Sequence, residues 1–170
     1  MTRRNLIHKW SVYGLGLVLV WLLDGCILPR YPLFGTIPML LPLAVAAVAV
    51  LEGAYGGAGF GMAVGLVWEL AYPGGFGGLV FGMAAAGLAA GSASQYILSQ
   101  SYPGCLICSC GVLLGLEALR LFRGVVTDMA AFGAMLPVAG AELALSLAWS
   151  PVIYLLFRSI YRRVGGTRLA

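Results

Sequence analysis

The chain has 170 residues, of which 61% are apolar and only 9% are charged. A soluble domain is roughly 45–50% apolar and about 25% charged, so this chain lacks the charged surface that contact with water requires. The composition therefore excludes a soluble globular enzyme, a disordered segment and a secreted disulfide scaffold. It indicates an integral membrane protein of one domain.

Stretches of about 20 residues with few charges predict six transmembrane helices, because that length crosses ~30 Å of hydrocarbon. Proline, glycine and charged residues separate these stretches. We expect an all-α bundle of six spans with short loops, forming a single polytopic membrane domain over 1–170. The predicted spans are 10–28, 35–51, 54–72, 77–98, 104–122 and 137–157.

The last span is the hardest to delimit, because its apolar block runs from 130 to 157. We start the span at Pro137, since proline suits the first turn of a helix. This choice makes 124–136 an interfacial or re-entrant segment. Pro151 is expected to kink the helix.

The basic residues lie mostly at the two ends of the chain, which gives seven on the terminal side of a six-span topology and three on the other. The positive-inside rule then places both termini in the cytoplasm, and we expect no cleaved signal peptide. No run of basic residues is long enough to follow a phosphate backbone, so we expect no nucleic-acid partner.

Four carboxylates fall within or beside the predicted spans, namely Asp24, Glu69, Glu117 and Glu142. A charged side chain at the centre of a bilayer costs at least ~2.5–3.5 kcal/mol. These groups must therefore face the bundle interior, reach an interface, bind a partner or be protonated. They are the candidates for a buried polar or partner-binding site.

Each acid also has a structural explanation. Asp24 lies a few residues from Arg30, which allows an interfacial ion pair, and Glu69 lies among aromatic residues at the end of its span. Glu117 has Arg120 at i+3, a local helical pair. Glu142 has no basic residue within one turn, so a buried interhelical contact and a functional site are both open for it.

Small residues at four-residue spacing let helices approach closely in a membrane. We expect these glycines to serve mainly packing within the bundle, with a face for a partner helix as the alternative. They are Gly57, Gly61, Gly65, Gly78, Gly82, Gly87, Gly91, Gly111 and Gly115.

The cysteines at Cys105, Cys108 and Cys110 have a metal-like spacing. A zinc or cluster site needs about four ligands, but the only other cysteine is Cys26 and the only histidine, His8, is at the cytoplasmic end. We therefore expect the cysteines to pack as small apolar residues, with no metal and no cofactor. The chain also has no Ser/His/Asp set and no phosphate-binding loop, so we do not expect an enzyme.

Residues 59–70 read GFGMAVGLVWEL and resemble the G-F-x-x-G-L-x-x-D segment of the rod shape-determining protein MreD family. A proline-led second span, IPMLLP at 37–42, and the glycine-rich PGGFGGL at 73–79 are similar to the family in order. The final helix, with its proline region and basic end, also looks like the family's last helix. The acid here is Glu69, where Asp is commoner.

The resemblance covers roughly 35–163 and implies a non-catalytic membrane scaffold of bacterial cell elongation. It implies a bitopic MreC-type partner and, through it, the peptidoglycan synthase complex and MreB. It also implies a fold similar to the substrate-binding subunits of energy-coupling-factor transporters, in the cytoplasmic membrane, with no small-molecule substrate.

Two other functions compete with the scaffold. One is a vitamin-binding subunit of an energy-coupling-factor transporter, although the first span lacks the A-x-x-x-A docking face that those subunits usually carry. The other is a proton-coupled channel or transporter that uses the four carboxylates.

Overall fold

The computed structural model describes residues 3–30, 36–71, 78–96, 101–126 and 132–164, and the described part contains six α-helices and no β-strand. The first helix continues through a π-helical turn, Leu23–Ile27, and a 3-10 turn, Leu28–Arg30. The helices are α1 (Arg3–Leu22), α2 (Leu40–Glu52), α3 (Ala54–Ala71), α4 (Gly78–Tyr96), α5 (Tyr102–Val126) and α6 (Phe132–Val164).

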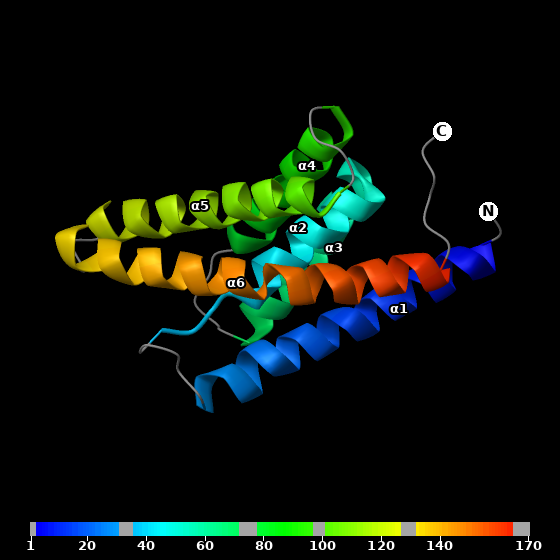
Figure 1. The fold of residues 1–170 in the computed structure, drawn as a ribbon, viewed down its shortest axis with the longest axis horizontal. Helices are drawn as coiled ribbons and strands as arrows, with labels where there is room; N and C mark the ends of the chain where they lie inside the picture. Colours follow the sequence, from blue (N-terminus) through cyan, green and yellow to red (C-terminus); the bar gives the residue numbers. More distant parts are fainter. Residues whose placement is uncertain (1–2, 31–35, 72–77, 97–100, 127–131, 165–170) are drawn as a thin grey trace.

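Three helical stretches are long and apolar enough to cross a membrane, namely Ile7–Arg30, Tyr102–Phe122 and Leu136–Val164. They belong to α1, α5 and α6, and Figure 1 shows α6 running beside α5 on one side and α1 on the other. The all-α class is therefore confirmed. The other helices are shorter or richer in glycine, so the predicted six-span bundle stays a prediction.

Helix α2 forms the centre of the molecule. Every residue from Leu40 to Leu51 is buried, which is expected of a helix that is apolar on all sides. It contacts each of the other five helices. Its 13 residues span about 20 Å at 1.5 Å per residue, which is less than the thickness of a bilayer core.

Helices α3 and α4 pack most closely, and glycine makes this possible. A Cβ at Gly61 would overlap the backbone of Met83, and one at Gly65 would overlap the backbone of Val80. Gly57, Gly87 and Gly91 are equally constrained, whereas Gly78, Gly82, Gly111 and Gly115 have open space beside them. Part of the predicted glycine set therefore packs helices inside the fold and part does not.

A second glycine feature places α3 against α2. Gly53 ends α2 with φ of 85°, a backbone conformation that L side chains rarely adopt. The chain therefore turns back within one residue, and α3 begins at Ala54.

Two helices begin at other residues than the spans predicted for them. The second helix begins at Leu40 rather than near residue 35, because Met39 before it is extended. The last helix begins at Phe132, so Pro137 lies inside it, while its stretch that is apolar enough to cross a membrane begins at Leu136. The described parts of 124–136 are the helical ends of α5 and α6. Residues 127–131 lie outside the described part.

We expect Gly61→Ala to destabilise the fold by about 1–3 kcal/mol, because the added methyl must push against backbone that cannot move independently. Thermal unfolding in detergent measures this effect. Gly59→Ala is the matched control in the same helix, since a Cβ there meets nothing within 4 Å. The control should be neutral or slightly stabilising because alanine favours helix. Equal stability of the two variants would contradict the close α3–α4 packing.

Candidate functional site

Polar side chains gather at both ends of α2. At its carboxyl end, Nζ of Lys9 donates to Oε2 of Glu52, and the hydroxyl of Tyr13 donates to Oε1 at 2.7 Å. We call these three residues the lysine cluster. The side chains of Lys9 and Glu52 are only 9% and 3% exposed, so the charges are enclosed. They join α1 to α2.

Aromatic rings from α3 and α6 pack against Tyr13 of the lysine cluster. Tyr13 stacks on Phe157 of α6, with ring centroids 6.2 Å apart and planes 8° apart. Phe60 of α3 meets both rings edge-on. The sequence analysis did not predict this cluster, because Lys9 and Glu52 lie 43 residues apart. Opposite charges on the same predicted side of the membrane were the available signal.

At the amino end of α2, side chains accept the backbone N–H groups that the helix itself cannot satisfy. Oδ1 of Asp24 accepts from the N–H of Leu40 at 3.1 Å. Oγ of Ser146 accepts from the N–H of Met39 at 2.8 Å and donates to the carbonyl of Glu142 at 2.6 Å. Asp24 thus holds a helix end, and in the described part of the chain it forms no ion pair with Arg30.

The predicted acids Glu117 and Glu142 meet at Arg120, and we call these three residues the arginine cluster. Nη1 of Arg120 lies 2.6 Å from Oε2 of Glu142 and 3.6 Å from Oε1 of Glu117. The expected i+3 pair is therefore present. Arg120 also supplies Glu142 with a partner from the neighbouring helix, 22 residues away in sequence, that the local sequence could not reveal.

Glu69 stands apart from both clusters. Its side chain is half-buried near the end of α3, and its Oε1 is enclosed without a hydrogen-bond partner in the structure. The adjacent Trp68 lines a cavity of about 200 Å³ together with Arg120 of the arginine cluster. The structure thus places Glu69 next to a cavity wall, and among the described residues it forms no ion pair.

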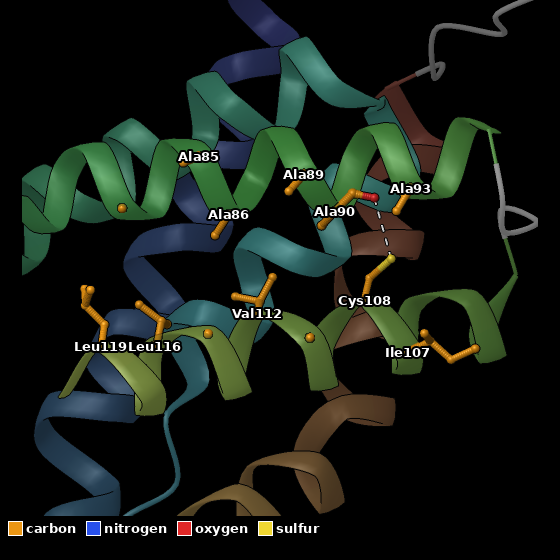
Figure 2. Close-up of a pocket in the computed structure, with 13 residues that line it drawn as sticks. Ala85, Ala86, Ala89, Ala90, Ala93, Ile107, Cys108, Val112, Leu116 and Leu119 are labelled. Atoms are coloured by element: carbon orange, nitrogen blue, oxygen red, sulfur yellow. Dashed lines mark hydrogen bonds between the residues drawn. The ribbon is translucent and has the colours of Figure 1, made fainter. Parts of the chain in front are cut away.

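A longer groove lies between α4 and α5 and encloses about 580 Å³. Figure 2 shows Ala86 and Ala90 of α4 facing Cys108, Val112 and Leu116 of α5 across it. We call it the α4–α5 groove. Its remaining lining residues are Gly82, Ala85, Ala89, Ala93, Ile107, Gly111, Gly115 and Leu119.

The glycines of the α4–α5 groove are not used for packing inside the fold. A Cβ at Gly82, Gly111 or Gly115 would meet nothing within 4 Å. Gly111 and Gly115 are exposed, so the groove is open along α5. The groove is therefore deeper at these glycines than it would be if each of them carried a side chain.

The cysteines of α5 take part in packing. Cys105 and Cys108 are buried, and Sγ of Cys108 donates to the carbonyl of Ala90 across the groove at 3.5 Å. Cys105 pairs with Ser109 one turn on. Within the described ranges, no three His, Cys, Asp or Glu side chains are grouped so that they could hold a metal ion.

No protein-family profile, curated protein or solved structure matches the chain. The assignment of a function must therefore rest on the geometry of the clusters and of the groove.

We expect Lys9→Met to destabilise the protein by about 3–5 kcal/mol, because it leaves the buried carboxylate of Glu52 without its cation. The double variant Lys9→Met/Glu52→Met should recover most of this loss, since it removes both charges together. Denaturation of the four proteins of this cycle in detergent gives the coupling energy. Additive effects of the two substitutions would contradict a coupled buried pair.

Proposed function

We propose that this protein is a non-catalytic membrane scaffold that binds a single transmembrane helix in the α4–α5 groove. The observation that carries the proposal is the open glycine floor of the groove. Where α3 packs on α4, glycine is matched to a close backbone neighbour, as at Gly61 and Gly65. At Gly82, Gly111 and Gly115, which together line one groove, no described residue comes within 4 Å of an added Cβ.

The dimensions of the groove favour one helix as its occupant. Its lining extends over 82–93 of α4 and 107–119 of α5. At 1.5 Å per residue these stretches are about 17–18 Å long, or roughly three helical turns. Helices in lipid associate through close packing and not through a hydrophobic force, so a low floor of small residues is what an incoming helix needs.

The resemblance to the MreD family identifies the partner that we propose. It is a bitopic MreC-type protein, whose single span would occupy the groove. Through it the scaffold would be linked to the peptidoglycan synthase complex and to MreB, and it would serve cell elongation and cell shape. The similarity of residues 59–70 to the family segment supports this choice.

We further propose the bacterial cytoplasmic membrane as the location, with all six helices in one bundle and both termini in the cytoplasm. The excess of basic residues at the chain ends supports this orientation. In such a bundle α2 is enclosed by the other helices, which is consistent with its complete burial.

A vitamin-binding transporter subunit is the second candidate, and the cavity beside Trp68 and Arg120 is the observation in its favour. Ligand pockets usually measure about 300–1,000 Å³, whereas this cavity measures about 200 Å³. The α4–α5 groove has a volume within that range, but it is open along α5, so we prefer a helix as its occupant and keep the scaffold as the proposal. Native mass spectrometry distinguishes the two, because a transporter subunit should retain one small molecule and a scaffold should be empty.

We expect Gly115→Leu to abolish co-purification of an MreC-type partner, because the added side chain fills the floor of the groove. Gly59→Leu is the matched control, since it also adds a leucine where a Cβ meets nothing, but on α3 and away from the groove. Both variants should unfold near the wild-type temperature. Depletion of the protein should round rod-shaped cells, and only the Gly59 variant should restore the rod shape.

Undiminished partner recovery with Gly115→Leu would remove the groove as the docking site. Normal cell shape after clean deletion, with no partner recovered by crosslinking, would remove the scaffold function itself.

A further inference from the structure

The arginine cluster contains two carboxylates and one cation. The side chains of Glu117 and Glu142 are only 7% and 13% exposed, and both carboxylates approach the same Nη1 of Arg120. Glu142 has the shorter ion pair, at 2.6 Å. Oε1 of Glu117 is enclosed, lies 3.6 Å from the guanidinium and has no hydrogen-bond partner.

The arginine cluster lies within two stretches that are apolar enough to cross a membrane. Glu117 is five residues from the end of one at Phe122, and Glu142 is six residues from the start of the other at Leu136. At 1.5 Å per residue these separations are about 8 and 9 Å. An uncompensated charge inside a membrane span is costly.

The neighbouring elements offer little to balance the second carboxylate. Helix α2 carries one ionisable group, Glu52, at its far end, and α4 carries only Tyr96, also at its far end. Asp24 accepts from the N–H of Leu40, and Glu69 lies beside the wall of the cavity that Arg120 lines. Both of these are acids, so neither offsets a negative charge.

Two further charged residues follow in sequence, Arg123 and Asp128, and their side chains lie outside the described part. The described charges of the cluster alone sum to one negative charge when both carboxylates are ionised.

We propose that Glu117 and Glu142 form a proton-binding site, in which one proton is shared between the two carboxylates and sits on Glu117. The carboxylate of Glu142 then pairs with Arg120, while the Glu117 carboxyl is neutral and donates a hydrogen bond toward Glu142. One proton makes the cluster electrically neutral, as in other carboxyl pairs that cannot both ionise at close range. This inference does not depend on the proposed scaffold function.

Glu117 holds the proton because it is the more enclosed acid and has the weaker contact with the cation. A protonated carboxyl can donate a hydrogen bond from its own oxygen. An ionised carboxylate would leave Oε1 as a buried acceptor with no hydrogen-bond donor. The proton, rather than a metal ion, fits the site because Nη1 of Arg120 lies within 4 Å of both carboxylates and its charge repels a second full cation.

Infrared spectroscopy of the full chain in lipid nanodiscs at pH 7 tests the site, since a protonated carboxyl has a carbonyl stretch that an ionised one lacks. The wild-type minus Glu117→Gln difference spectrum should show the loss of one protonated carboxyl, with a shift in D₂O. Glu142→Gln should also remove this band, because Glu117 then ionises opposite Arg120. Arg120→Gln should increase it, because both acids then take a proton.

The control is Arg123→Gln, which changes a nearby charge outside the cluster and should leave the band in place. Retention of helicity shows that each variant is folded, and glutamine is isosteric with the neutral acid, so Glu117→Gln should be the mildest substitution. Identical carboxyl bands in wild type and Glu117→Gln would overturn the proposal. A band that persists in Glu142→Gln would also overturn it, because Glu117 would then hold its proton independently.

Discussion

The rest of the structure depends on one constraint, which is that a short apolar helix ends inside the molecule. Helix α2 has 13 residues, and α5 and α6 beside it have 25 and 33. Its terminal N–H and C=O groups therefore lie where water does not hydrogen-bond to them. Each such group left unpaired in lipid costs several kcal/mol. Polar side chains from other helices must come to both ends.

This constraint explains where the scarce charged residues lie. Asp24 and Ser146 accept the N–H groups at the start of α2, and an acid is favourable there because the amino end of a helix is partly positive. At the other end the N–H of Gly53 donates to the carbonyl of Ala49, and Lys9 balances the charge of Glu52. Asp24 at the amino end agrees with the helix dipole, whereas Glu52 lies at the partly negative end and Lys9 offsets this.

Sequence analysis could predict what depends on local pattern. Each continuous apolar run predicted a helix, and each of the six described α-helices overlaps one of these runs. The i+3 spacing predicted the contact of Glu117 with Arg120. It placed the start of the last span at Pro137, because proline favours a first turn, whereas the helix itself begins five residues earlier, at Phe132.

The lysine cluster could not be predicted in this way, because it joins residues 43 positions apart. The same holds for the contact of Arg120 with Glu142, which depends on how α6 is rotated against α5. The glycine pattern had a similar limit. Spacing identified the small residues, but only the fold separates Gly61, which meets a backbone, from Gly115, which meets nothing.

The α4–α5 groove and the arginine cluster occupy different faces of one helix. Gly115 and Glu117 are two residues apart, which corresponds to about 200° around an α-helix at 3.6 residues per turn. Gly115 is exposed in the groove, while Glu117 is buried against α6. Leu116 and Leu119 lie between these faces and line both the groove and the cavity of Arg120. A helix seated in the groove would therefore contact this leucine wall, with the half-exposed Arg120 side chain on its other side.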